Sequence, residues 1–504
     1  MTPKARDAAL DMAPDEFRRL GHQLVDQIAD FLASLAGKSV TPGEPAGAVR
    51  EALNANRALP EHGADAGELL SRAASLLFEH SLFNGHPKFF GYITSSAAPI
   101  GALGDLLAAA VNPNVGNWTL APVATEIEMQ TVRWIAELIG YPVGTGGLLV
   151  SGGNMANFVC FLAARTSKMG AGVRARGVNR DTQRLITYAS AETHTWIQKA
   201  TDLFGFGTDS IRWISTDAYQ RMDAGALRRQ IQDDRQKGDT PFLIVGTAGS
   251  VSTGAVDPLR SIGAIAREFD LWFHIDGAYG ALAAAVPGDI GNDDLRALAD
   301  ADSVAVDPHK WLYAPLEAGC ALVKRPDDLR NAFSYRPPYY HFEDDVLHYV
   351  DYGPQNSRGF RALKVWLALQ QAGRSGYVQM ISDDIALARR LYCVVEAHPQ
   401  FEALTQNLSI TTFRYVPTDL RDVRDDPTVA EYLNRLNQTL LTRIEKSGDA
   451  FLSNAVVKGR FALRACIVNF RTSAADVDAL PALMAALGQQ SDHTLRASGC
   501  GPGR

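Results

Sequence analysis

The stretch SVAVDPHKWLYAP (residues 303–315) places a lysine just beyond an apolar run that is typical of a buried strand. Val304 and Val306 belong to the run, and Lys310 follows after a Pro-His step, with Trp311 next in the chain. Burial disfavours the charged form of an amine and lowers its pKa, so a buried lysine becomes a nucleophile toward carbonyl groups. Lys310 is therefore a candidate catalytic amine. The alternative is a lysine whose stem covers apolar surface while its head reaches water.

Short apolar strands alternate with helical segments on both sides of this stretch. GGLLV (146–150) precedes a long helical segment, FLIVGTAGS (242–250) precedes another, and LWFHIDGAYG (271–280) is a further buried strand. Such alternation predicts an α/β fold with a mainly parallel central sheet and helices on both faces. Ligands in these folds bind beyond the carboxyl ends of the strands, which is where Lys310 falls.

The two ends of the chain differ from this central region. Residues 14–36 have the spacing of an amphipathic helix, and the segment up to residue 98 is apolar without an evident core of its own. We expect this arm to pack on the rest of the chain or on a second subunit. The last part contains helices and strands that indicate a small α+β domain. We therefore predict an N-terminal arm (1–98), a large domain (99–373) and a small C-terminal domain (374–504).

Composition excludes several classes of protein. The net charge of -7 does not favour binding to nucleic acid or to an anionic membrane. The five cysteines are scattered, without the spacing of a disulfide framework or of metal ligands, so no metal site is expected. No apolar run is long enough to span a membrane, and the first residues lack the pattern of a signal peptide. We predict a cytoplasmic protein.

Three other signals point to the same edge of the predicted sheet. In LLVSGGNMANF (148–158) two glycines let the backbone approach a ligand, and Asn154 would cap a helix whose N-terminus attracts phosphate. Asp276 ends an apolar strand and is followed by small residues, so its carboxylate can meet a flat heterocycle. His194, near a helix start, can stack on a planar ligand. Each signal also has a structural alternative: an ordinary turn, a helix cap or a surface histidine.

Together the four signals indicate a pyridoxal 5'-phosphate site. This cofactor requires a phosphate cradle, a carboxylate for its ring nitrogen, a group against its ring face and a lysine that forms a Schiff base. A nucleotide site is the other option for a parallel sheet. However, the chain has neither a dinucleotide glycine fingerprint nor a Gly-Lys-Ser/Thr phosphate loop.

The chain also resembles the group II pyridoxal-phosphate-dependent amino-acid decarboxylases, among them the aromatic L-amino-acid decarboxylases. The segments that carry the resemblance span nearly the whole chain: FRRLGHQLVDQIADFL, HPKFFGYITS, APVATEIE, SGGNMAN, HIDGAYGA, DPHKWL and RGFRALKVW. The resemblance implies a type I aminotransferase-like fold and a homodimer with active sites at the subunit interface. The N-terminal arm would then pack on the partner subunit.

The resemblance also assigns roles to individual residues. Lys310 would form the Schiff base with the cofactor, Asp276 would pair with the pyridine nitrogen, and His194 would stack on the ring. The other cofactor-binding positions implied are Gly153, Asn154 and His309 at the phosphate, Ala278 on the second ring face, and Thr247 near the ring substituents or Asp276.

Two positions depart from relatives in the family. Several relatives have Ser-Ala-Ser in the phosphate loop, where this chain has Gly152, Gly153 and Asn154. Backbone amides can still bind phosphate there. Asp307 stands where animal members have asparagine, and a carboxylate would repel a phosphate dianion unless it points away or is protonated.

The implied reaction is decarboxylation of an L-amino acid to the amine and CO2 through a Schiff base and a quinonoid, which makes the protein a lyase. The segment FSYRPPYYHFEDDV (333–346) resembles the family's catalytic loop, and Tyr339 is the candidate proton donor, with Tyr340 one position away. In related aldehyde synthases this position is phenylalanine, so a tyrosine favours the amine. The alternative is that these tyrosines only pack the loop.

The substrate pocket is expected to include Tyr92, Ile93 and Thr94, with Trp118 supplied by the other subunit. Tyr92 and Trp118 suit an aromatic substrate: tryptophan, tyrosine, phenylalanine or DOPA. Asn84, Asn114 and Gly116 replace bulkier residues of animal relatives and would either leave room for an indole or bind a polar substrate.

Two other reactions stay open. One is decarboxylation of glutamate, aspartate or 2,4-diaminobutyrate, with Arg358 as a candidate for a distal carboxylate. The other is oxidative deamination coupled to decarboxylation, which gives an aldehyde.

Overall fold

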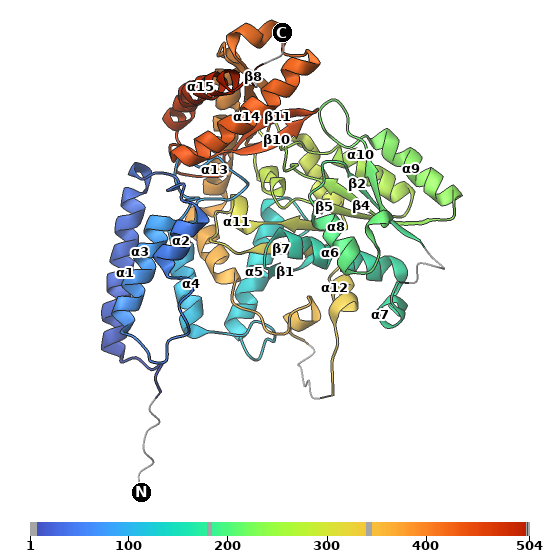
Figure 1. The fold of residues 1–504 in the computed structure, drawn as a ribbon. Coiled ribbons are helices and arrows are strands. Elements are labelled where there is room, and N and C mark those ends of the chain that lie inside the picture. Colours follow the sequence, from blue (N-terminus) through green and yellow to red (C-terminus); the bar gives the residue numbers. More distant parts are fainter. Residues whose placement is uncertain (1–7, 179–183, 339–344, 500, 502–504) are drawn as a thin grey trace.

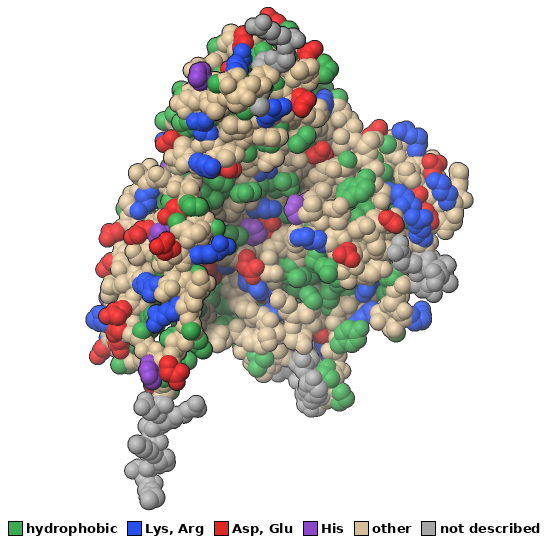
Figure 2. Space-filling model, viewed as in Figure 1, with side chains coloured by type: hydrophobic (Ala, Val, Ile, Leu, Met, Phe, Trp, Pro, Cys, Tyr) green, Lys and Arg blue, Asp and Glu red, His purple; other side chains and the backbone are tan. Residues whose placement is uncertain are grey.

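The computed structural model describes residues 8–178, 184–338, 345–499 and 501. Its strands form two sheets, one of seven strands and one of four. Figure 1 shows the larger sheet in the body of the molecule and the smaller sheet with its helices at the C-terminal end. The N-terminal helices stand beside the larger sheet. Figure 2 shows that the surface is hollowed where these parts meet, with histidine and basic side chains visible inside the hollow.

The seven-stranded sheet is mainly parallel. Its strands, in the order in which they neighbour each other, are β1 (Gly146–Val150), β7 (Gly319–Val323), β6 (Ser303–Val306), β5 (Trp272–Asp276), β4 (Thr240–Thr247), β2 (Leu185–Ser190) and β3 (Ile211–Ile214). Only β7 is reversed: it is antiparallel to β1 and β6, and the other neighbours are parallel. As a result β1, β4, β5 and β6 have their carboxyl ends at the same edge.

Helices cover both faces of this sheet because its strands are apolar on both sides. In β1, for example, Leu149 packs into one core, and Leu148 and Val150 pack into the other. The first face is covered by α5 (Pro122–Leu138), α9 (Ala224–Gln236), α10 (Leu259–Glu268), η3 (Gly280–Ala285), η4 (Asp293–Asp300) and part of α13 (Ala362–Ala397). The second is covered by α6 (Gly153–Met169), α8 (Trp196–Leu203) and α12 (Pro326–Phe333).

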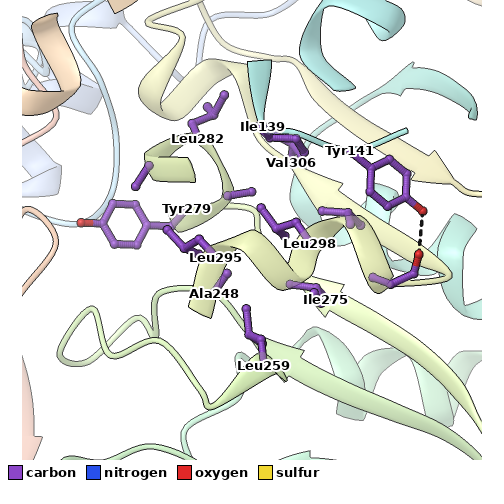
Figure 3. Packing of buried hydrophobic residues seen from close by; sticks show 14 of the residues in the cluster. Ile139, Tyr141, Ala248, Leu259, Ile275, Tyr279, Leu282, Leu295, Leu298 and Val306 are labelled. Carbon is purple, nitrogen blue, oxygen red and sulfur yellow. Dashed lines mark hydrogen bonds between the residues drawn. The ribbon is translucent and has the colours of Figure 1, made fainter. Parts of the chain in front are cut away.

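Figure 3 shows the core on the first face. Ile275 of β5 and Val306 of β6 meet Leu295 and Leu298 of η4 there. Tyr141 closes one side of this core and donates a hydrogen bond from its hydroxyl to the carbonyl of Ala301 at 3.0 Å. This packing fixes the strands whose ends carry the candidate site.

The four-stranded sheet has the order β10 (Ser453–Val457), β11 (Arg460–Cys466), β9 (Ile410–Tyr415) and β8 (Phe401–Asn407), and all its pairs are antiparallel. The C-terminal part of α13 packs on it with α14 (Pro427–Ser447) and α15 (Ala474–Ala497). The two sheets and their helices confirm the predicted fold class. Helix α13 departs from helical geometry at Gly373 (φ 62°, ψ 174°), and the predicted boundaries at 98/99 and 373/374 stay predictions.

The N-terminal segment is helical, as expected. It contains α1 (Pro14–Ser34), η1 (Leu35–Gly37), α2 (Ala46–Leu53), α3 (Ala66–His80) and α4 (Pro99–Val111). Many of its apolar side chains are not covered: Phe17, Leu69, Leu77, Leu103 and Leu107 are all more than half exposed. Of the helices in the described ranges, none is both long enough and apolar enough to cross a membrane.

The remaining short helices are α7 (Gly172–Arg176), α11 (Pro308–Trp311), η2 (Thr208–Ser210), η5 (Tyr349–Asp351) and η6 (Thr418–Val423). Of these, α11 bears directly on function because it carries Lys310.

Candidate active site

Most of the residues singled out from the sequence lie at one edge of the seven-stranded sheet. Thr247 ends β4 and Asp276 ends β5, and the two are paired neighbours across the strands. Lys310 lies in α11, directly after β6, and Gly153 begins α6, directly after β1. Parallel strands bring these ends together, so segments more than 150 residues apart in the chain meet at one site.

Lys310 is held by an ion pair that the sequence did not predict. Its Nζ lies 3.0 Å from Oδ2 of Asp307, one turn earlier. The Asp307 side chain is 3% exposed and the Lys310 side chain 18%. Lys310 is therefore ion-paired with a buried carboxylate and is not an isolated buried amine.

Asp276 is fixed by two donors. Trp196 Nε1 donates to Oδ2 at 2.7 Å, and the backbone N–H of Ala278 donates to Oδ1 at 3.2 Å. Asp276 is 7% exposed. These two hydrogen bonds fix the orientation of the buried carboxylate at the edge of the sheet.

A buried layer supports Asp276 from below. His274, two residues earlier in β5, makes hydrogen bonds to Asn157 Oδ1 at 2.7 Å and to Ser303 Oγ at 2.9 Å. Burial lowers the pKa of His274 to about 4, so its ring is neutral at neutral pH. Trp196 packs edge-on against this ring, with centroids 5.6 Å apart. The indole that binds Asp276 therefore packs against a buried, neutral imidazole.

His194 lies in the turn between β2 and α8 and remains exposed. Its Nδ1 accepts a hydrogen bond from the backbone N–H of Trp196 at 3.2 Å, which leaves Nε2 as the protonated nitrogen of the neutral ring. Desolvation lowers the pKa of His194, and the charges of Asp276 and Lys310 also act on it. The stacking of His194 on the cofactor ring stays a prediction.

Thr247 is buried and is part of the same wall. Its hydroxyl lies 3.3 Å from the hydroxyl of Thr193, just before His194. Its backbone N–H donates to Oδ2 of Asp257 at 2.9 Å. Thr247 therefore lies beside Asp276, one of the two placements expected for it.

The N-terminus of α6 has no side-chain cap, and Asn154 is not its N-cap. Gly152 is the N-cap, with φ 104° and ψ 177°, and the helix begins at Gly153. The prediction failed because Gly152 adopts a backbone conformation that glycine takes readily, so the helix starts earlier. The first helical hydrogen bond runs from the N–H of Ala156 to Gly152, and no side chain caps the N-terminus. The preceding amides can therefore bind an anion.

His309 connects this cradle to the lysine turn. Its Nδ1 lies 2.7 Å from the carbonyl oxygen of Ala318, and its Cε1 would lie 3.3 Å from a Cβ placed on Gly152. Burial lowers the pKa of His309. The hydroxyl of Ser95 donates to the carbonyl of His309 at 2.7 Å. Ser95 thus ties the segment of Tyr92 to the site.

The predicted pocket residues Tyr92, Ile93 and Thr94 immediately precede Ser95 and so lie beside the lysine turn. Tyr92 is 57% exposed and has a left-handed backbone (φ 48°). Its N–H donates to Ser453 Oγ at 2.8 Å. Ile93 packs against the core, and Thr94 is partly buried. The exposed ring of Tyr92 is available to a ligand.

Trp118 is not brought to the site within one chain. Its indole donates to Glu126 Oε1 at 2.9 Å, and it lines a groove of about 690 Å³ with residues of α5 and with Leu347. The contribution of Trp118 to a pocket of another subunit stays a prediction.

The gap expected at Gly116 does not exist. A Cβ on Gly116 would lie 2.1 Å from the carbonyl oxygen of Asn356, so the glycine is required by backbone contact. The side chain of Asn114 is also in use, because its Oδ1 accepts from the N–H of Gly116 at 3.2 Å and of Arg358 at 3.0 Å. The Asn114 oxygen is thus used within the chain, and the two alternatives for the substrate pocket, room for an indole or binding of a polar substrate, stay predictions. Asn84 is partly buried.

Arg358 is a structural residue. It is 3% exposed, pairs with Glu128 and donates to the carbonyls of Val115 at 2.9 Å and Leu149 at 2.7 Å. Its guanidinium also lies over the ring of Tyr349. The candidate for a distal carboxylate is therefore already neutralised and buried.

Tyr339 and Tyr340 lie outside the described residues, so the role of Tyr339 as proton donor stays a prediction. Two other residues were missed. Trp196 binds Asp276, and Ser95 binds the lysine turn. An indole directly after the turn of His194 was a signal for the first. The short polar pair Ser95 and Ser96 offered none that is specific.

The residues present fit pyridoxal phosphate. The uncapped N-terminus of α6 can bind a phosphate, the fixed carboxylate of Asp276 can bind a pyridine N–H, and Lys310 supplies the amine. Ala278 borders the cradle, since a Cβ on Gly153 would lie 3.1 Å from its methyl group. One buried acceptor, Oδ1 of Asp307, has no hydrogen-bond partner among the described residues. A polar ligand is thus expected beside it.

Comparison with known proteins gives a consistent result. Residues 49–416 match the family model described as the pyridoxal-dependent decarboxylase conserved domain. An aromatic-L-amino-acid decarboxylase of Bacillus atrophaeus is 33% identical over 469 residues, which are 92% of this chain and 94% of that protein. A phenylacetaldehyde synthase of a Rosa hybrid cultivar is 30% identical over 471 residues, 91% of each chain. The crystal structure of Oryza sativa TDC with PLP and tryptamine matches with a TM-score of 0.87 at 26% identity, over 96% of this chain and 99% of that chain.

Proposed function

Because the chain belongs to the pyridoxal-dependent decarboxylase family, we propose that it removes CO2 from an aromatic L-amino acid and releases the amine. That the protein is a decarboxylase with pyridoxal phosphate as cofactor follows from the family. The substrate class and the residue roles are the proposal. The observation that carries it is the fixed carboxylate of Asp276 at the same edge as Lys310 and the α6 cradle.

Each residue of this edge has a distinct task. The amine of Lys310 would hold the cofactor and yield its place to the substrate amine. Asp276, oriented by Trp196 and Ala278, would keep a proton on the ring nitrogen. The neutral ring of His194 would lie against the ring face. When bound, the cofactor supplies the conjugated ring that accepts the electron pair left by CO2.

Proton return to the substrate Cα needs a donor at that atom. We assign this task to Tyr339, whose phenol is a suitable general acid. The assignment favours the amine over an aldehyde, which is the product named for the rose relative. The aldehyde route therefore remains as an outcome of the test.

The aromatic substrate is supported by the exposed ring of Tyr92 beside the lysine turn and by two relatives. One is named an aromatic-L-amino-acid decarboxylase, and the other was solved with tryptamine. The case for an acidic substrate is weaker, because Arg358 is buried against Glu128. An aromatic side chain would instead gain from apolar contact and ring packing with Tyr92.

We also propose a homodimer with active sites at the interface. The exposed apolar side chains of α1, α3 and α4 need a cover, and Trp118 can reach a pocket only in another subunit. The cytoplasm is the proposed location. The described cysteines, Cys160, Cys320, Cys393 and Cys466, are all free thiols, as in a reducing compartment.

The test is a product screen of the purified protein with added pyridoxal phosphate. Tryptophan, tyrosine, phenylalanine and DOPA would be compared with histidine, glutamate, aspartate and 2,4-diaminobutyrate, and amine, aldehyde and peroxide would be measured. We expect aromatic amines without peroxide. Lys310→Ala should lose turnover and the cofactor absorbance band. Amines from acidic or diamino substrates alone would overturn the substrate class, and aldehyde with peroxide would overturn the role of Tyr339.

A further inference from the structure

Asp307 lies at the N-terminus of α6, where the cofactor phosphate is proposed to bind. Its Oδ2 would lie 2.6 Å from a Cβ on Gly153, so the carboxylate presses against the first residue of α6. This is the uncapped helix N-terminus that attracts anions. Asp307 is 2% exposed, and its Oδ1 is buried without a hydrogen-bond partner among the described residues. The carboxylate thus has one oxygen beside the N-terminus of α6 and a second, buried oxygen without a partner among the described residues.

Four titratable groups lie around Asp307 or act on it, and one of them is a cation. Lys310 Nζ lies 3.0 Å and His309 Nε2 3.7 Å from its Oδ2. The charge of Asp307 also acts on His194 and on the thiol of Cys320 in β7. Desolvation lowers the pKa of both histidines and raises the pKa of Cys320, so all three are neutral at neutral pH. Of these four groups only Lys310 adds positive charge.

The Asp307 carboxylate is not free to move away from the N-terminus of α6. Asp307 follows β6 directly, and its backbone N–H donates to the carbonyl of Ala278 at 3.2 Å. Its backbone carbonyl accepts from the N–H of Lys310 at 2.9 Å. With the backbone fixed and the side chain almost fully buried, the carboxylate stays beside the cradle. Two anions in contact at low exposure are strongly disfavoured unless one carries a proton.

We propose that Asp307 shares a proton with the cofactor phosphate, so that cofactor binding takes up one proton and weakens as the pH rises. The proton comes from solvent and lies between a carboxyl oxygen of Asp307 and a phosphate oxygen, and no covalent bond changes. Before binding, the same carboxylate serves as the counter-ion of Lys310. An asparagine at this position, as in animal relatives, would donate an N–H to phosphate without a proton from solvent. This inference rests on the cofactor assignment.

The test measures binding rather than turnover. Cofactor-free protein would be titrated with pyridoxal phosphate between pH 6.5 and 8.5, followed by absorbance. Calorimetry in two buffers of different ionisation enthalpy would count protons. Uptake of one proton on binding corresponds to a tenfold rise in Kd per pH unit. We therefore expect the Kd of the wild type to rise with pH more steeply than that of Asp307→Asn, by a factor approaching tenfold per pH unit. At the highest pH, Asp307→Asn should bind about tenfold more tightly or better.

Asp302→Asn is the matched control. Asp302 lies at the opposite end of β6 and accepts a hydrogen bond from the backbone N–H of Phe273 at 2.9 Å. This variant loses a partly buried carboxylate next to the same strand, and its cofactor affinity should keep the wild-type pH slope. Equal slopes and equal proton counts for the wild type and Asp307→Asn would overturn the proposal alone. Absence of cofactor binding at every pH in the wild type would instead overturn the cofactor assignment.

Discussion

The two donors of Asp276 come from different elements, and their removal should have graded effects. Trp196 begins α8, and the N–H of Ala278 follows β5. A hydrogen bond to a charged group contributes about 1.5–3 kcal/mol. Trp196 is thus expected to act as a positioning residue, through the carboxylate that it orients.

We expect Trp196→Phe to lower kcat roughly tenfold or more with little change in KM, because the phenyl ring keeps its packing on His274. Asp276→Asn should lose a factor of about 10² to 10³, since the ring nitrogen loses its ionised partner. Steady-state kinetics and cofactor content would be measured for both. Equal losses in the two variants, or full turnover of Asp276→Asn, would contradict these roles.

The candidate site residues were predictable from the sequence where they lie at the ends of strands. Lys310, Asp276 and Gly153 each follow an apolar run, and a parallel sheet brings such ends together. Trp196 and Ser95 were missed because their contacts join positions 80 and 214 residues apart. Local pattern carries no information about such pairs. Lys310 and Asp307 are only three residues apart in the chain, but the burial of both partners depends on the surrounding fold.

At the scale of elements, α13 braces the turn that carries Lys310. Asp384 of α13 accepts hydrogen bonds from Trp311 Nε1 at 2.8 Å and from the hydroxyl of Tyr313 at 2.7 Å. Both donors flank the end of α11. Burial nevertheless raises the pKa of Asp384 to about 7 from an ordinary value of 3.8. The protonated form is therefore favoured in the folded protein.

The pH dependence follows from the sign of this shift. The stabilising contribution of Asp384 is fully present below about pH 4 and is lost as the pH rises to about 7. A shift of this size corresponds to about 4 kcal/mol. Relative to the wild type, Asp384→Asn should lose less stability between pH 4 and 7.

Chemical denaturation at several pH values would measure this difference. Asp383→Asn is the control, because Asp383 is the exposed neighbour on the same helix. The control should follow the wild-type profile. A profile for Asp384→Asn that is parallel to the wild type would contradict the assignment of this shift to Asp384.

The sequence predicted which segments form strands and helices, but it predicted the ends of these elements and the directions of the strands less well. The pattern of apolar runs indicated strands, but it could not show that β7 is reversed between β1 and β6. The start of α6 depends on the conformation of Gly152 rather than on the capping tendency of Asn154. Similarly, the break of α13 at Gly373 interrupts a helix whose composition is continuous.

At the scale of the whole molecule, the surface of α4 is the best test of the homodimer. Leu103, Leu107 and Val111 are 52%, 54% and 68% exposed and recur at intervals of four residues on one face. Gly104, adjacent to this stripe, packs on α13, where a Cβ would lie 3.2 Å from Lys364 Cα. The helix is thus in contact with α13 next to a stripe of exposed apolar side chains.

We expect Leu107→Glu to shift the protein from dimer to monomer, because a charge would be buried without a partner in the interface. Light scattering after size exclusion would measure the mass. Val423→Glu in the small domain is the control: Val423 is 49% exposed and should tolerate the charge. A wild type that is monomeric and fully active at micromolar concentration would contradict the shared active site.

The tethers of the lysine turn have a consequence for how the protein is made. Ser95 lies 214 residues before its partner His309, and Asp384 lies 73 residues after Trp311. A ribosome must therefore release most of the chain before both tethers can form. We expect a growing polypeptide to expose the amine of Lys310 before the hydrogen bonds of Ser95 and Asp384 have formed. Productive capture of the cofactor should then be a late event in biogenesis, confined to chains that have emerged at least as far as Asp384.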